Sequence, residues 1–107
     1  MTHYKNMEEW IKEGEKRFGQ DQMEWKFVCP VCRYVAATKD WLAIGAEEDE
    51  VAFSCVGRHM KNKRKAFGGK EGPGPCDYAG GGFYNMNPVK IGGEENNYFD
   101  FAPRGDE

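Results

Sequence analysis

Four cysteines are the residues of this sequence best suited to specific chemistry: Cys29, Cys32, Cys55 and Cys76. The first two form the motif Cys29-Pro-Val-Cys32, a spacing that lets two thiolates turn around one tetrahedral cation. Zinc suits such a site because cysteine thiolates are its preferred structural ligands and because it has no redox chemistry. We therefore expect one Zn²⁺ bound by all four cysteines, since this set leaves no odd thiol and the turn GPGPC presents Cys76 rigidly.

Other uses of these residues stay open at this point. His59 follows Cys55 after three residues, so a site with His59 in place of Cys76 is the main alternative. The same thiolates could hold iron, or the chain could bind no metal. Disulfides would need an oxidising compartment, which nothing in the sequence indicates. A thioredoxin-type redox motif is disfavoured, because Pro30 follows the first cysteine and both flanks have the pattern of strands.

Catalysis by this zinc is not expected. A catalytic zinc keeps a position open for water or substrate, whereas four thiolates close the coordination shell. The chain has only two histidines, His3 and His59, and it lacks the His-x-Glu and Pro-Cys-x-x-Cys patterns of zinc deaminases. A nuclease centred on His59 and Asn62 is the remaining enzymatic alternative. We expect a binding protein in which the zinc is structural.

The hydrophobic pattern predicts the elements that position these cysteines. Residues 6–18 have a helical period, with Asn6 as the N-cap, Glu9 three residues later and Gly19 as the stop. Residues 24–29 and 34–38 flank the CPVC turn as two strands. Asp40 is expected to cap a short helical turn through Trp41, Leu42 and Ile44, which Gly45 ends. Further strands are predicted at 51–55, which would deliver Cys55, and at 89–91. The expected fold class is α+β: a zinc-ribbon-like small antiparallel β-sheet with an N-terminal α-helix.

The chain has the length of one domain. Its 107 residues are too aromatic for a disordered chain, and a core of this size commonly needs a metal or disulfides for stability. We assign residues 1–93 to a single zinc-ribbon-like domain that contains a basic loop at 58–75. Residues 94–107 form an acidic tail with three aromatic residues, which is either flexible or docked on the domain through those side chains.

Charge is strongly polarised along the sequence. The net charge is −3, yet residues 58–75 carry +5, while the segments before and after them each carry −4. The loop therefore offers a candidate surface for binding nucleic acid or a protein partner. Its proposed contact residues are Arg58, Lys61, Lys63, Arg64, Lys65, Phe67 and Lys70.

Membrane insertion and export are not expected. No apolar run approaches the roughly 18 residues that a membrane span needs. The first residues, MTHYKNMEEWIKEGEKRFG, contain no apolar core of a signal peptide. We expect a cytoplasmic protein of undetermined oligomeric state.

Several motifs in one order are similar to those of an uncharacterised family of small bacteriophage and prophage proteins, which we regard as zinc-ribbon-like. They are CPVC, Asp40-Trp41, Cys55-Val-Gly-Arg58, Gly74-Pro-Cys-Asp-Tyr-Ala-Gly-Gly-Gly-Phe83 and Asn87-Pro-Val89. The resemblance covers residues 24–91. It departs at Arg33, where zinc knuckles usually carry a glycine that eases the turn around the metal. The resemblance implies a phage-derived protein in the host cytoplasm and implies no activity.

Two binding functions follow from these observations. The first is a zinc-containing module that binds a host protein or a defence complex, which the phage resemblance, the polarised charge and the aromatic tail favour. The alternative is a zinc ribbon that binds nucleic acid through the cations of the basic loop, with Phe67 stacking on a base.

Overall fold

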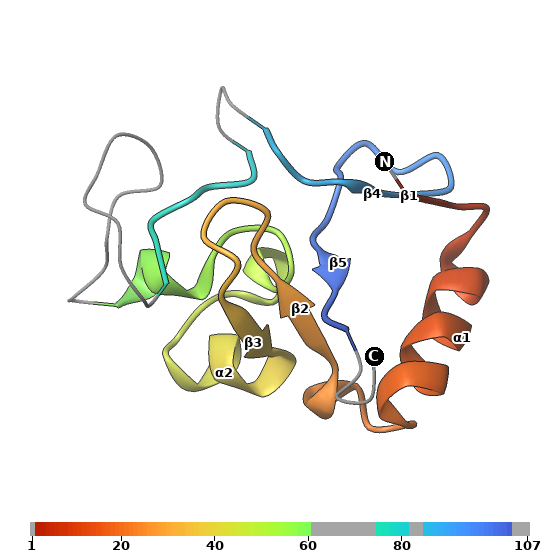
Figure 1. Ribbon diagram of the computed structural model, residues 1–107, viewed down its shortest axis with the longest axis horizontal. Helices are drawn as coiled ribbons and strands as arrows, with labels where there is room; N and C mark the ends of the chain where they lie inside the picture. Colours follow the sequence, from red (N-terminus) through yellow and green to blue (C-terminus); the bar gives the residue numbers. More distant parts are fainter. Residues whose placement is uncertain (1, 61–74, 82–84, 104–107) are drawn as a thin grey trace.

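The computed structural model describes residues 2–60, 75–81 and 85–103, which form an N-terminal helix packed against two small sheets (Figure 1). A three-stranded antiparallel sheet has the order β3-β2-β5, and β1 pairs with β4 in a second, parallel sheet. These features confirm the predicted α+β class. The elements are β1 (Thr2–Tyr4), α1 (Met7–Phe18), η1 (Gln22–Glu24), β2 (Lys26–Val28), β3 (Val35–Ala37), α2 (Thr38–Ala43), η2 (Glu48–Glu50), η3 (Val56–His59), β4 (Val89–Ile91) and β5 (Asp100–Phe101).

Helix α1 forms where the sequence predicts it. The Asn6 side chain accepts a hydrogen bond from the backbone N–H of Glu9 at 3.0 Å, and the Glu9 carboxylate accepts one from the N–H of Lys5 at 2.7 Å. Gly19 ends the helix with a φ of 91°, and its N–H donates to the Glu15 carbonyl. Both ends of α1 are therefore capped by residues with the conformations that caps require. None of the helices in the described residues is long and apolar enough to cross a membrane.

The hairpin predicted around CPVC is present. Strands β2 and β3 pair antiparallel, with Lys26 opposite Ala37 and Val28 opposite Val35. The prediction of a strand at 51–55 was wrong, because Ala52 has a φ of 57° and the backbone turns there instead of extending. The third strand comes from the tail: β5 pairs with β2, and Phe101 lies opposite Phe27. Of the two alternatives for the tail, the structure shows docking for its residues up to 103; residues 104–107 lie outside the described part.

Two further details differ from the sequence-based expectations. The strand at 89–91 is present as β4, but its partner is β1, which the sequence analysis did not identify; Thr2 lies opposite Val89 in parallel register. Asp40 does not precede α2. It is the third residue of that helix, and its carboxylate accepts a 2.8 Å hydrogen bond from the N–H of Ala37, which caps the helix from inside.

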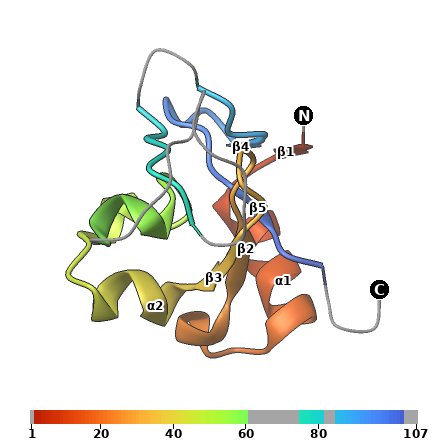
Figure 2. The same cartoon turned by 60° about the vertical axis from the view of Figure 1, so that its left-hand side comes forward.

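Aromatic side chains fill the core between α1 and α2. Both views show β2 and β5 running between these two helices (Figures 1 and 2). Phe27 on β2 stacks on Phe101 of β5 with ring centroids 5.1 Å apart, and Trp10 of α1 stacks on Phe101 at 5.4 Å. On the other side, Trp41 of α2 meets Phe27 edge to face. Trp41 and Phe27 are about 1–2% exposed, and the tail residues Phe99 and Phe101 are buried as well. The tail aromatics are therefore part of one continuous core.

Gly14 is the one buried residue of α1, and its lack of a side chain is required for packing. A Cβ atom at this position would lie 2.5 Å from the ring of Trp25, closer than real Cβ contacts come. The ring cannot move away easily, because its Nε1 donates a 2.8 Å hydrogen bond to the Gly19 carbonyl and its edge packs against Trp10. The glycine that weakens the helix locally therefore lets α1 approach β2.

Replacement of Gly14 by alanine tests this packing. In an exposed helix the change stabilises by up to about 1 kcal/mol, but here overpacking against Trp25 should lower the free energy of unfolding by about 1–3 kcal/mol. Urea denaturation followed by tryptophan fluorescence measures the difference. The exposed Lys12→Ala variant on the same helix is the control and should change stability by less than about 0.5 kcal/mol. An increase in stability for Gly14→Ala would contradict the packing described.

Candidate metal centre

The hairpin β2–β3 supplies two of the four sulfurs. Cys29 follows the last residue of β2, and its N–H donates to the Tyr34 carbonyl at 3.0 Å across the turn. The Cys29 carbonyl accepts from the N–H of Arg33, also at 3.0 Å. Arg33 closes this turn with a φ of 68°, a conformation that glycine adopts far more readily than residues with a side chain. Arginine at a position where zinc knuckles usually carry glycine therefore leaves the turn intact, but it holds this one residue in a strained conformation.

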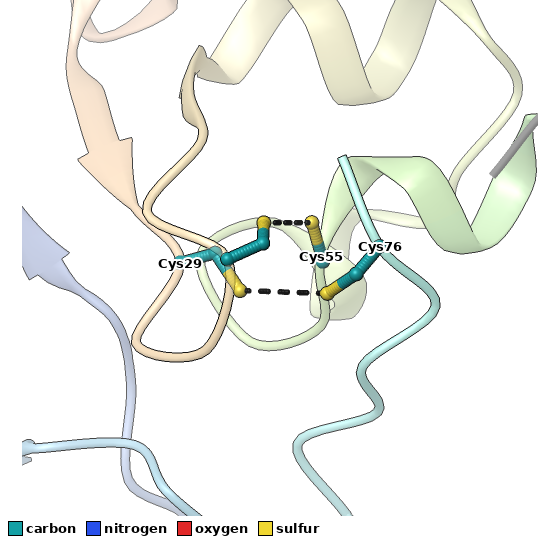
Figure 3. A group of neighbouring side chains, drawn as sticks. Cys29, Cys55 and Cys76 are labelled. Carbon is teal, nitrogen blue, oxygen red and sulfur yellow. Dashed lines mark hydrogen bonds between the residues drawn. The ribbon is translucent and has the colours of Figure 1, made fainter. Parts of the chain in front are cut away.

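Cys55 and Cys76 come from two segments that lie side by side. Cys55 directly precedes η3, and its N–H donates to the Tyr78 carbonyl at 2.9 Å. Gly57, two residues later, approaches Cys76 so closely that a Cβ atom there would overlap the Cys76 carbonyl oxygen. Close backbone contact at a glycine therefore brings the third and fourth cysteines together, and Figure 3 shows both of them facing Cys29 of the hairpin.

The four sulfur atoms form a compact group. The Sγ atoms of Cys29 and Cys76 are 3.9 Å apart, those of Cys32 and Cys55 are 3.7 Å apart, and all four lie within 4.8 Å of one another. Four sulfurs at zinc–sulfur distances of about 2.3 Å would be separated by about 3.8 Å. A disulfide would need about 2.05 Å, and all four cysteines are free. The spacing therefore fits a tetrahedral metal ion and does not fit cystines.

Burial makes a cation necessary if these thiols are to ionise together. Cys29, Cys55 and Cys76 are at most 1% exposed, while Cys32 is partly exposed. Burial raises the pKa of the Cys76 thiol to about 12. A hydrogen bond from Cys29 lowers the pKa of Cys32, whereas hydrogen bonds with Cys29 and Cys32 raise that of Cys55. Burial and the like charges of neighbouring thiolates therefore oppose ionisation of the group as a whole, and several thiolates together require a positive ion.

The structure does not assemble the alternative ligand set. His59 lies at the end of η3, and its Nε2 is 3.8 Å from a carboxylate oxygen of Glu50 rather than in the group of sulfurs. Arg58 is 3.6 Å from the same carboxylate. The other predicted contact residues of the basic loop lie outside the described residues: Lys61, Lys63, Arg64, Lys65, Phe67 and Lys70.

Sequence reasoning missed the polar residues that fasten the segment of Cys76. The Tyr78 hydroxyl accepts a hydrogen bond from the N–H of Met86 at 2.6 Å, and the Ser54 hydroxyl accepts one from the N–H of Gly80 at 3.1 Å. Gly80 passes so close to the Phe53 carbonyl that a Cβ atom would overlap it. The glycine run indicated the tight backbone, but the hydroxyl partners are distant in sequence and left no local signal.

A family model provides the comparison that identifies the chain. It is described as VVA0879-like and matches residues 6–102. The chain belongs to the VVA0879-like family. The match includes α1, all four cysteines and β5, so it extends beyond the residues 24–91 that the ordered sequence motifs cover. Searches of curated proteins and of solved structures found no match.

The strained turn at Arg33 gives a prediction for the VVA0879-like fold. Glycine in place of Arg33 should raise the free energy of unfolding by about 0.5–1 kcal/mol, because it accepts the left-handed conformation without a Cβ penalty. Alanine keeps the Cβ atom, so Arg33→Ala should give no comparable gain and serves as the matched control. Thermal denaturation at constant pH and metal content measures both. Equal effects of glycine and alanine would show that the backbone conformation of the turn is not the cause.

Proposed function

We propose that this VVA0879-like protein binds one Zn²⁺ through Cys29, Cys32, Cys55 and Cys76 and uses the folded domain as a zinc-ribbon-like binding module. The observation that carries the proposal is the group of four sulfurs within 4.8 Å, in which the separations of 3.9 and 3.7 Å are close to those of a tetrahedral site. The position of the first pair in a β-hairpin turn supports the zinc-ribbon comparison.

The zinc in this proposal is structural and the protein is not an enzyme. Four sulfur ligands leave no position for water or substrate. Three of the four cysteines are buried, so access to the ion is limited. Structural zinc contributes roughly 10–16 kcal/mol in small modules, compared with roughly 5–15 kcal/mol for the total stability of a typical domain. We therefore assign to the ion the role of holding the hairpin, Cys55 and Cys76 together.

The binding partner that we propose is a host protein or a defence complex in the cytoplasm, as would suit a phage-derived protein. The polarised charge supports recognition of a complementary surface, because clustered charges steer association and select orientation. The described part of the chain supplies acidic residues on η2 directly beside the start of the basic segment, where Arg58 and Glu50 are paired.

Nucleic acid is the second candidate partner. The segment 58–75 carries +5 and is flanked by Cys55 and Cys76, so metal binding would fix both of its ends near one point. Such a constraint would present the cations at high local density to phosphates. The acidic charge of the other two segments opposes binding to long nucleic acids, which is why this function ranks second.

Native mass spectrometry of single variants tests the ligand set. The unaltered protein should carry one zinc ion. Cys76→Ser should lose zinc or bind it far more weakly, because one of four thiolates is removed, whereas His59→Ala should keep full occupancy. The reverse pattern, with zinc retained by Cys76→Ser and lost by His59→Ala, would contradict the proposed site.

Removal of the metal tests its structural role. A strong chelator should abolish the cooperative thermal transition and release the buried tryptophans to solvent, and added zinc should restore both. Near-ultraviolet circular dichroism of the same sample follows the aromatic core. A metal-free protein that keeps its near-ultraviolet spectrum and its transition temperature would show that the domain folds without the ion.

Titration of fluorescent single- and double-stranded DNA and RNA at two salt concentrations separates the two partners. Nucleic-acid binding predicts steep salt dependence that disappears when Lys61, Lys63, Arg64 and Lys65 are replaced by serine. The leading proposal predicts no binding even at low salt, together with capture of a discrete protein from host lysate by the zinc-loaded chain. Salt-dependent binding that is lost in the serine variant would show that the partner is nucleic acid and would contradict the leading proposal.

A further inference from the structure

A half-open cavity separate from the cysteines is lined by residues of α1, η1 and α2. Its volume is about 510 Å³, within the range of roughly 300–1,000 Å³ typical of small-ligand sites. Met7 and Trp10 of α1, Met23 of η1 and Leu42 of α2 contribute to its lining. None of the four cysteines lines it.

Aromatic rings and methionines make the interior apolar. Trp25 and Phe27 are almost fully buried and line the cavity from β2 and the residue before it, while Trp10 and Tyr98 line it as partly exposed side chains. At the surface, Met7 is 41% exposed and Met23 is 45% exposed. Exposed methionine side chains adapt their shape to ligands, and an apolar lining can pack against the carbon stem of a long side chain.

The charges that line the cavity have one sign. Asp21 and Glu48 contribute carboxylates, and no lysine or arginine among the described residues lines it. Neither carboxylate forms an ion pair within the described part of the chain, although one oxygen of Asp21 accepts a hydrogen bond from the N–H of Met23. Both residues are exposed, and the charge of Asp21 also acts on Lys39, which is not in the lining, where it helps to raise the pKa of the ammonium group. An apolar lining with two carboxylates that form no ion pair among the described residues is complementary to a positively charged group on an apolar stem.

We infer that this cavity binds an arginine or lysine side chain of a partner protein, whose carbon stem packs against the apolar lining and whose charge pairs with Asp21 and Glu48. The inference names the chemistry of the partner and therefore rests on the proposed binding role, but it does not depend on the zinc ligands. It also assigns a second recognition surface, distinct from the basic segment 58–75.

The three tryptophans provide a built-in readout. The indole N–H of Trp25 donates to the Gly19 carbonyl and that of Trp41 to the Ser54 carbonyl, whereas that of Trp10 has no hydrogen-bond partner in the described structure. Trp41 does not line the cavity. The Trp10 ring lines the cavity, so in a ¹H–¹⁵N spectrum of the zinc-loaded chain its indole resonance, assigned by its absence in Trp10→Phe, should shift when a ligand enters, while that of Trp41 stays constant.

The probes are the peptides acetyl-Leu-Arg-Leu-amide and acetyl-Leu-citrulline-Leu-amide, which differ in charge and hardly in shape. The arginine peptide should shift the Trp10 resonance saturably and bind at least about fivefold more tightly than the citrulline peptide. Glu48→Gln and Asp21→Asn should each remove part of this preference; asparagine at position 21 can still cap η1. Higher salt should reduce the preference as well.

Three outcomes would overturn the inference: no shift of the Trp10 resonance, equal affinity for the two peptides, or a shift with protein concentration alone, which would show that a second copy occupies the cavity. Zinc content measured on the same samples, together with the lysate capture described above, keeps the two claims apart. A protein that retains zinc and captures its partner but ignores both peptides preserves the proposed function and refutes this site.

Discussion

The convergence of four sulfurs is the constraint on which the rest of this small structure depends. In the described part of the chain the strands are two or three residues long and the second sheet has two strands, so hydrogen bonding alone gives little cooperativity. The sulfur group joins three segments that are distant in sequence: the CPVC hairpin, the turn before η3 and the chain around Cys76. A cation at the centre of the group would offset the mutual repulsion of buried thiolates, because each thiolate is attracted to the same positive charge.

The aromatic core and the group of four sulfurs are packed together. Phe27 lies two residues before Cys29 in the sequence, and its ring packs against Trp41 on one side and Phe101 on the other. Trp41 in turn donates its indole N–H to the carbonyl of Ser54, the residue before Cys55. Positions of the sulfurs are thus linked to the packing of rings from α1, α2 and the tail. Loss of either the ion or the core should loosen the other, since they share β2 and the segment at 54–55.

Local patterns predicted the local structure well, and non-local contacts explain what was missed. The caps of α1 and the hairpin around CPVC depend on residues within a few positions, so residue type and spacing were sufficient. Counting thiols led to the group of four cysteines. The strand at 51–55 failed because one alanine, Ala52, takes a left-handed conformation that no local rule indicates. The pairings of β5 with β2 and of β1 with β4 join residues about 70 to 90 positions apart, beyond the reach of periodicity.

X-ray absorption at the zinc edge of the purified protein tests the central claim most directly, because it reports the ligand atoms around the ion. Our account predicts four sulfur neighbours at about 2.3 Å and no nitrogen or oxygen in the coordination shell. A shell that contains nitrogen or oxygen, or a protein that carries no zinc, would contradict it.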